Sequence, residues 1–209
     1  MSLDTYENLK IELINWSHRD DMDLKIDTFI DLAESEMLAN AIEPLQVRDQ
    51  ETLAAFSTNT TDRFVALPTD YQSSRKLRIQ IANGESEPLR FRTPEQMNLV
   101  SSAGLPKFFT VTDQIEFDRV SDQVYTGEIQ YYADLTALSS SNTTNTILTN
   151  HPTIYLFGAL WALNEHVDEE QKAASFYNKF ISSIRGANKK AKIGRFGPSP
   201  VMRIEGPTP

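Results

Sequence analysis

The chain has 209 residues and no cysteine, and its 40% hydrophobic and 10% aromatic residues are typical of one globular domain or two small ones. The net charge of −9 argues against a protein that coats DNA, and the missing thiols exclude a disulfide scaffold, cysteine catalysis and an iron–sulfur cluster. The first residues lack the features of a signal peptide, and the longest apolar run (residues 154–163) is too short to span a membrane. We therefore expect a soluble protein with no membrane partner.

Residues 1–60 are expected to contain two helices. Asp4 and Glu7 have the spacing of a capping box ahead of the first helix. The second helix is expected from about Asp21 to Ala41, with Pro44 stopping the chain beyond it. Apolar residues recur at helical spacing in both, namely Tyr6, Leu9, Leu13 and Trp16 in the first, and Met22, Ile26, Phe29, Ile30, Ala33 and Met37 in the second.

Residues 61–133 are expected to form an antiparallel β lobe, because the apolar period changes from 3.6 to 2. Leu77 and Ile79 alternate with polar residues, and Asn83-Gly84 predicts a hairpin turn. Thr93-Pro94 is a good helix start, so a short helix is expected from there to about Gly104. Further strands are expected at residues 108–111, 115–117 and 124–132, and their tight connections favour antiparallel pairing.

Residues 134–150 are rich in Ser, Thr and Asn and are expected to form a loop. Helices are expected again in residues 151–192, the first of them (151–166) apolar on nearly every face and the second fading near Gly186. Residues 193–209 hold four prolines and three glycines, which predicts an extended arm. The order of elements indicates an α+β fold, in which the N- and C-terminal helices form one bundle with the β lobe inserted.

The two ends of the chain have opposite charge. Residues 1–51 carry 13 acidic and 4 basic side chains, whereas residues 172–209 carry 8 basic and 1 acidic. Terminal helices could pair within the chain, or each basic end could dock on an acidic face of another subunit or partner. The acidic end includes Asp23, Asp27, Asp31 and Glu34, which fall on one helix face. That face is either solvated or a surface for a basic partner.

No motif for catalysis, for a cofactor or for a metal ion occurs in the sequence. His18, His151 and His166 lack the spacing of metal ligands, and no nucleophile elbow or phosphate-binding loop is present. A cluster at Asp20, Asp21 and Asp23 lacks the glycine and distal glutamate of a calcium loop. We therefore expect a protein that is not an enzyme and that binds no cofactor.

The C-terminal arm combines apolar anchors with cations. Its composition also fits a frayed terminus, but large apolar side chains are unusual in a tail that stays in water. An arm laid on another surface, by strand addition or by anchors in pockets, accounts for them. The residues concerned are Arg195, Phe196, Val201, Met202, Arg203 and Ile204.

Two parts of the sequence resemble the tail adaptor proteins, or head–tail connectors, of short-tailed bacteriophages. The first is SLDTYENLKIELINW with IDTFIDLAESEM, within residues 1–40. The second, within residues 104–180, begins with LPKFFTV and continues through the paired Tyr131 and Tyr132 and the segment Leu135–Ser139 to Asn150-His151-Pro152.

This resemblance implies a virion structural protein that forms a ring of twelve copies beneath the portal at the head–tail junction, after synthesis in the host cytoplasm. The ring would continue the DNA channel without binding DNA specifically, and would dock tail nozzle or tail fibre proteins. The C-terminal arm would reach the portal protein. Between copies, we expect the acidic helix to meet basic residues of a neighbour: Asp23, Asp27, Asp31 and Glu34 on one side and Lys189, Lys190 and Lys192 on the other.

Two other classes of function stay open at this stage. A small ligand- or carbohydrate-binding module could use Tyr125, Tyr131 and Tyr132 as a stacking platform, although adjacent residues in a strand point to opposite faces. A metal-dependent hydrolase could use Asp20, Asp21 and Asp23.

Overall fold

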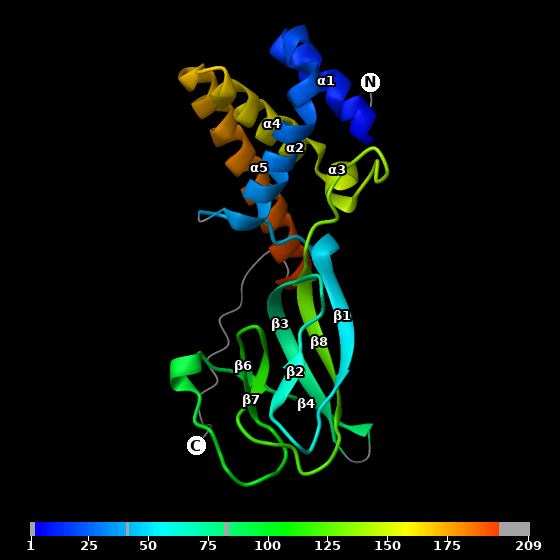
Figure 1. The fold of residues 1–209 in the computed structure, drawn as a ribbon, viewed down its shortest axis with the longest axis vertical. Helices are drawn as coiled ribbons and strands as arrows, with labels where there is room; N and C mark the ends of the chain where they lie inside the picture. Colours follow the sequence, from blue (N-terminus) through cyan, green and yellow to red (C-terminus); the bar gives the residue numbers. More distant parts are fainter. Residues whose placement is uncertain (1–2, 41, 82–83, 197–209) are drawn as a thin grey trace. The chain divides into compact units, whose positions relative to one another are not determined.

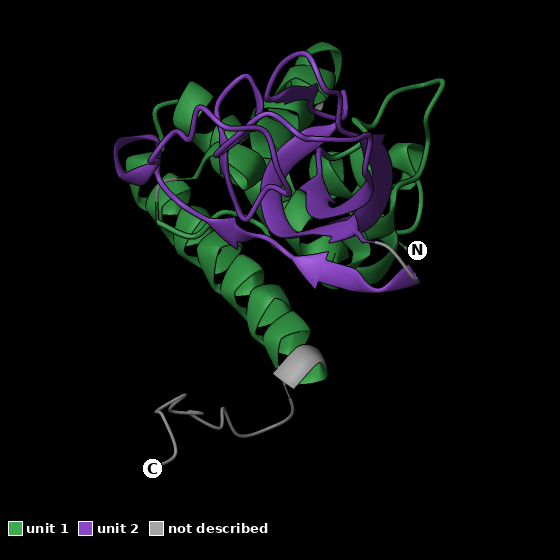
Figure 2. Cartoon of the chain, turned by 90° about the horizontal axis from the view of Figure 1, so that it is seen from below, with its two compact units in different colours: residues 1–49, 135–209 green, residues 50–134 purple. Residues whose placement is uncertain are grey.

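The computed structural model describes residues 3–40, 42–81 and 84–196, with the backbone alone for Asp20, Arg195 and Phe196. The chain is an α+β protein, as predicted. It divides into two units, one of helices (residues 1–49 and 135–209) and one of strands (residues 50–134), which Figure 2 shows in green and purple. The predicted range 1–60 therefore includes residues of the strand unit, and residues 135–150 of the predicted loop belong with the helices.

Helix α1 (Tyr6–Ser17) begins one residue later than the predicted capping box would place it. Thr5 is its N-cap and accepts a hydrogen bond from the backbone N–H of Asn8, so Asp4 does not cap the helix. The Asp4 carboxylate instead accepts a hydrogen bond from the Asn8 side chain, at 2.9 Å. The helix ends at His18, which adopts the left-handed conformation with φ of 53°.

Helix α2 (Ile26–Ala39) is shorter than predicted. Residues 20–25 form a 3₁₀ helix, η1 (Asp20–Lys25), ahead of it. The predicted apolar stripe is confirmed from Ile26 onwards, because Ile26, Phe29, Ile30, Ala33 and Met37 are all buried. Met22 lies in η1 and is partly buried against the same core.

After the strand unit, the described part of the chain forms three helices: α3 (Thr146–Asn150), α4 (Pro152–His166) and α5 (Glu170–Phe196). The first of them lies in the segment predicted to be a loop, where the Asn145 side chain caps it by accepting a hydrogen bond from the Leu148 N–H. The fully apolar pattern of α4 is confirmed, since the helix is buried over most of its length. Figure 1 shows α2, α4 and α5 side by side in the helical unit.

Close packing of α4 against its two neighbours depends on Gly158. A methyl group at this position would lie 2.9 Å from the Ala33 side chain in α2 and 2.9 Å from the Phe180 ring in α5. Glycine therefore allows α4 to approach both helices at once. The core around this contact also includes Leu9, Leu13, Ile30, Met37, Tyr155, Leu160 and Ile184.

Helix α5 continues well beyond the predicted end at Gly186. Ala187 and Asn188, the two residues after Gly186, are both buried. The Asn188 side chain accepts a hydrogen bond from the Gln46 N–H (2.8 Å) and donates one to the Pro44 carbonyl (2.9 Å). These tertiary contacts hold the helix together where its own sequence favours an end.

The first sheet of the strand unit has the order β1-β8-β3-β4 and is antiparallel throughout. Strand β1 (Glu51–Ser57) was not predicted from the sequence; it pairs with β8 (Thr126–Ala133). The predicted hairpin is confirmed: β3 (Tyr71–Gln80) pairs with β4 (Ser86–Pro88), and Gly84 between them has a φ of +77°.

The second sheet has the order β2-β7-β6-β5 and is not wholly antiparallel as predicted. Strand β7 (Gln114–Phe117) pairs antiparallel with β2 (Phe64–Ala66) and with β6 (Phe108–Val111), whereas the short β5 (Arg90–Phe91) runs parallel to β6. The helix predicted after Thr93 is only a 3₁₀ turn, η4 (Pro94–Gln96), because no residue in that turn is buried to anchor a longer helix.

Candidate protein–protein interfaces

The predicted extended arm is contradicted at its start. Residues 193–196 are the last turn of α5, so neither Arg195 nor Phe196 has an extended backbone. Lys189, Lys190, Ala191 and Lys192 are good helix formers, and the helix continues through Gly194. Val201, Met202, Arg203 and Ile204 lie outside the described residues.

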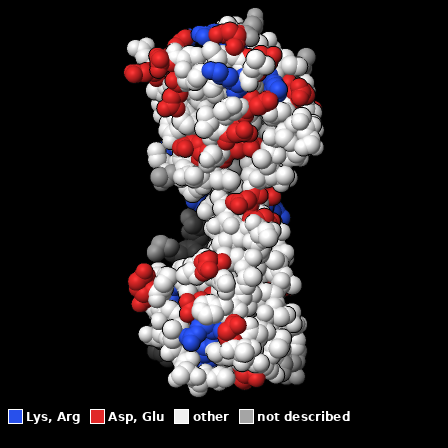
Figure 3. Space-filling model, viewed as in Figure 1, with Lys and Arg blue, Asp and Glu red and all other residues white. Residues whose placement is uncertain are grey.

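The four predicted acidic contact residues have different surroundings. Asp23, Asp27 and Asp31 are exposed in η1 and α2, and Figure 3 shows carboxylates gathered over this part of the helical unit. Asp27 already forms an ion pair with Lys10 of α1, at 2.8 Å. The Lys10 ammonium holds the pKa of Asp27 below its ordinary value.

Glu34 is not part of the exposed acidic face, which corrects the prediction. Only 7% of the residue is exposed, because it faces the core of the helical unit. Its carboxylate accepts hydrogen bonds from the Leu138 N–H (2.8 Å) and the Tyr155 hydroxyl (2.7 Å). Burial raises the pKa of Glu34, and these two hydrogen bonds oppose part of that rise. The residue therefore has a structural role within one copy.

The predicted basic contact residues lie together on the last turns of α5. Lys189, Lys190 and Lys192 are exposed and form no ion pair with any residue that the structure describes. Lys190 also lines a hollow of about 370 Å³ with Arg48 and His151. Burial and the nearby Lys190 lower the pKa of His151.

A row of aromatic rings across three helices of the helical unit was not predicted from the sequence. Phe157 of α4 lies between Trp16 of α1 and Phe176 of α5, with ring centroids 6.2 and 6.4 Å apart. The Lys179 ammonium lies over both phenylalanine rings, 5.6 Å from the centroid of Phe157 and 5.0 Å from that of Phe176. Trp16 is exposed, whereas Phe157 and Phe176 are half-buried against the core. Aromatic residues at helical spacing predict core packing, so the pattern alone did not indicate rings that also reach the surface.

The strand unit has an open strand edge beside an apolar hollow. Residues 71–76 of β3 pair with β8 on one side, and no described strand pairs with them on the other. The hollow of about 720 Å³ beside them is floored by Leu89, Phe91 and Phe109. Two irregularities in register and the cations Arg75 and Lys76 interrupt this edge. Such features oppose non-specific pairing of an edge strand with a strand of another chain.

The stacking platform proposed for a ligand-binding module is contradicted. Tyr125, Tyr131 and Tyr132 are all buried, and at least two of their hydroxyls are in hydrogen bonds, from Tyr131 to Asp70 and from Tyr125 to Asp122 (both 2.7 Å). Burial and Asp70 raise the pKa of Tyr131 to about 12. The rings of Tyr125 and Tyr131 belong instead to the core of the strand unit.

The residues considered for metal binding have other partners or lie apart. Asp21 forms a bidentate contact with Arg19 (2.8 and 2.9 Å), and His166 lies 2.9 Å from the Lys25 ammonium. Among the side chains that the structure describes, no group of three or more His, Asp and Glu residues is arranged to hold a metal ion. No described helix is long and apolar enough to cross a membrane.

Comparison with protein families decides between these readings. A model of the SU10 adaptor protein family matches residues 4–203. The chain belongs to this family. The resemblance to phage tail adaptors is therefore confirmed, and the match also includes residues 41–103 and 181–203, which the sequence resemblance did not cover. A search among curated proteins found no significant match.

Membership of the SU10 adaptor protein family defines the role of the chain in outline. It is a structural adaptor of a bacteriophage and a component of the virion, and such adaptors interact with other head or tail proteins. Proteins of this kind are typically not enzymes. The surfaces described above are accordingly candidate contacts between proteins.

Proposed function

We propose that the chain is one subunit of a ring of about twelve copies that joins the portal to the tail at the head–tail junction and continues the DNA channel. The observation that carries this proposal is the match to a phage adaptor family over residues 4–203, nearly the whole chain. The two units suit such a position, because a joining protein needs separate surfaces for its neighbours in the ring and for the proteins above and below it.

Contacts between copies are proposed to be partly electrostatic. Asp23 and Asp31 are exposed on one side, and Lys189, Lys190 and Lys192 are exposed cations without ion pairs among the described residues. The Debye length falls from about 10 Å at 0.1 M salt to about 3 Å at 1 M. The ring should therefore dissociate more readily at 1 M salt, and equal stability at both concentrations would count against these contacts.

DNA is proposed to pass through the ring without specific binding. The net charge of −9 disfavours tight contact with phosphates, which suits a channel through which DNA must slide. The cations of α5 would then serve protein contacts. Tail nozzle or tail fibre proteins would bind the side of the ring opposite the portal.

The portal-docking segment is proposed to be residues 197–209, which follow the end of α5 at Phe196. Val201, Met202 and Ile204 supply apolar anchors and Arg203 a cation. The test is capture of the portal protein of the same phage by the tagged full-length chain and by a variant that ends at residue 196. The full-length chain should capture the portal and the variant should not. A full-length chain that fails to bind the portal would contradict the proposed function.

A further inference from the structure

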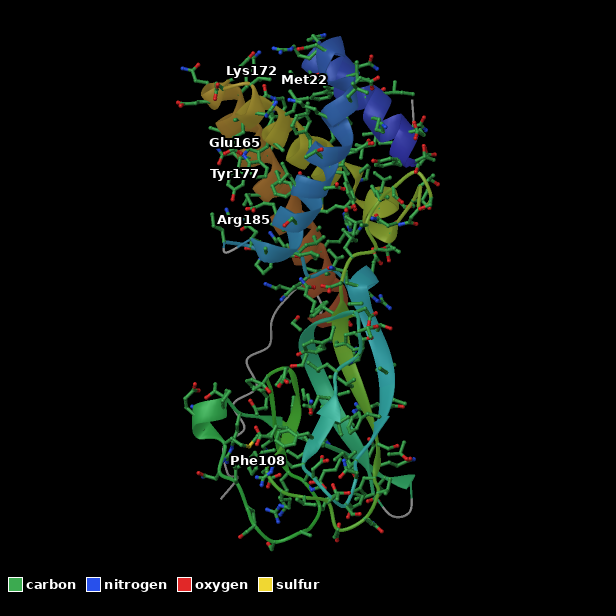
Figure 4. All side chains as sticks on the ribbon, viewed as in Figure 1. Met22, Phe108, Glu165, Lys172, Tyr177 and Arg185 are labelled. Atoms are coloured by element: carbon green, nitrogen blue, oxygen red, sulfur yellow. The ribbon has the colours of Figure 1, made fainter. Side chains whose placement is uncertain are left out.

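The outer face of α5 is cationic and has small side chains between its lysines. After Glu170 the helix contains no carboxylate. Lys179 and Lys189 on this face form no ion pair with a described residue, and the exposed Ser182 and Gly186 lie between them. Figure 4 shows Lys172 and Arg185 projecting from the same helix. A second helix could approach such a face closely, and its charge calls for carboxylates.

Beside this face, α4 and α5 form an open hollow with an aromatic floor. Its volume is about 450 Å³, and Phe157 is the aromatic ring that lines it. Lys179 also lines the hollow, and its ammonium lies over the rings of Phe157 and Phe176. The remaining lining consists of small or polar side chains of α5, namely Ser175, Asn178, Ser182 and Ser183. The hollow therefore fits an apolar side chain that is flanked by a carboxylate.

The outer face of α2 has that composition. Leu32 is 49% exposed and lies next to Asp31, which is also exposed. Leu24, in η1 just before the helix, is 97% exposed, which is unusual for a large apolar side chain. Its neighbours in the sequence include three exposed carboxylates, those of Asp21, Asp23 and Asp27. The other exposed residues of α2 are Asp27, which pairs with Lys10, and the smaller Thr28, Ser35 and Ala39.

We propose that, in the ring described above, the outer face of α2 of one copy packs into the hollow between α4 and α5 of the next copy. Leu32 then covers Phe157, and Asp31 pairs with Lys179. This inference rests on the proposed ring. A second copy is the occupant because one chain carries both surfaces with complementary charge and shape. Two different surfaces that meet head to tail generate a closed ring when the rotation between copies closes.

The absence of cysteine makes a direct test possible. In the full-length variant with both Leu32→Cys and Ser182→Cys, a short bismaleimide should link successive copies and give a ladder of covalent oligomers on a denaturing gel. Each single variant should give no ladder, and a mixture of the two single variants should stop at dimers. Reactions are run with and without the portal ring, so that assembly on the portal is also sampled.

Four further variants test the interface and its charge pairing. Thr28→Cys with Ser182→Cys repeats the test without removing a leucine. Leu32→Cys with Ser35→Cys, both exposed on α2, is the matched control that should give no ladder. Lys179→Glu should lower self-association about tenfold at 0.1 M salt, and adding Asp31→Lys should restore it. Loss without restoration would overturn the Asp31–Lys179 pairing.

The results separate this inference from the function on which it rests. Portal capture without a ladder from either double-cysteine variant would overturn the interface and leave the adaptor function standing. A chain that neither self-associates nor binds the portal would overturn both. Binding of duplex DNA that Lys179→Glu abolishes, again without a ladder, would assign the outer face of α5 to DNA and would also overturn the proposal.

Discussion

The Tyr155 hydroxyl in α4 donates a hydrogen bond of 2.7 Å to the Glu34 carboxylate in α2, although the two residues are 121 positions apart. The same carboxylate accepts the Leu138 N–H, and the Asn145 side chain donates to the Tyr155 hydroxyl at 2.6 Å. One buried carboxylate thus connects α2 and α4 with the Ser/Thr/Asn-rich segment that precedes α3. It fixes the course of that segment across the helical unit.

Replacing Glu34 tests this network. Glu34→Ala should cost about 1–3 kcal/mol of unfolding free energy, because it leaves the buried Leu138 N–H without its acceptor. Glu34→Gln retains an acceptor oxygen and should cost much less. Urea denaturation of both variants measures the difference. Equal losses for the two substitutions would contradict a hydrogen-bonding role.

The pH dependence of stability should report the same group. Burial raises the pKa of Glu34 above its ordinary value of 4.5, so the folded state favours the protonated form. Ionisation in the folded state therefore costs stability as pH rises from 4.5 through the raised pKa, and the cost is constant above it. The stability of Glu34→Gln relative to the natural chain should increase across that interval and then stay level. Denaturation at a series of pH values checks this, and a difference that does not change with pH would contradict it.

Two glycines in the helices should respond oppositely to alanine. Gly158→Ala should destabilise the chain by about 1–3 kcal/mol, since the new methyl group would press on Ala33 and Phe180. Gly186→Ala meets no atom within 4 Å and should stabilise α5 by about 0.5–1 kcal/mol. Thermal or chemical denaturation of the pair at low protein concentration is the measurement. Destabilisation by Gly186→Ala there would show that a contact within one copy requires the glycine.

The Lys10–Asp27 ion pair should contribute little. Its partners are partly solvated, so Asp27→Asn should cost no more than about 1 kcal/mol at low salt. The pKa of Asp27 is lowered in the folded state, so this contribution is present above pH 3.8 and is lost as the pH falls through the lowered pKa. A double-mutant cycle with Lys10→Met isolates it. A coupling that persists well below that range, or in 1 M salt, would be inconsistent with an ion pair.

Truncation after Phe196 should separate folding from docking. Removing residues 197–209 leaves α5 and all the described packing in place, so the melting temperature should not change. Portal capture should be lost, because the proposed anchors Val201, Met202 and Ile204 are removed. A truncated chain that unfolds at a lower temperature would show that the segment is part of the fold.

Local signals in the sequence predicted the elements whose burial is nearly uniform or strictly periodic. The apolar run of α4 predicts a buried helix, and the alternation around Leu77 and Ile79 predicts a strand with one buried face. Strand β1 was missed because it reads weakly by itself, and its pairing partner β8 lies about seventy residues later. The end of α5 was misplaced because Gly186 signals an end locally, whereas Asn188 is held by distant residues.

The candidate interfaces were predictable only as charge. The excess of carboxylates in α2 and of lysines in α5 is visible in the sequence, and the exposure of Asp23, Asp31 and Lys189 agrees with it. Burial of Glu34 could not be predicted, because its partners Leu138 and Tyr155 follow the inserted strand unit in the sequence, more than 100 positions after Glu34. The half-buried position of Phe157 beside Lys179 likewise depends on where three helices meet.

Co-sedimentation of the purified full-length chain with the portal ring of the same phage tests the central claim most directly. We expect co-migration in a fixed ratio near one chain per portal subunit, weakened at 1 M salt and lost when residues 197–209 are removed. A chain that stays a compact monomer in the presence of the portal, at every salt concentration tested, would contradict its role as a ring-forming adaptor.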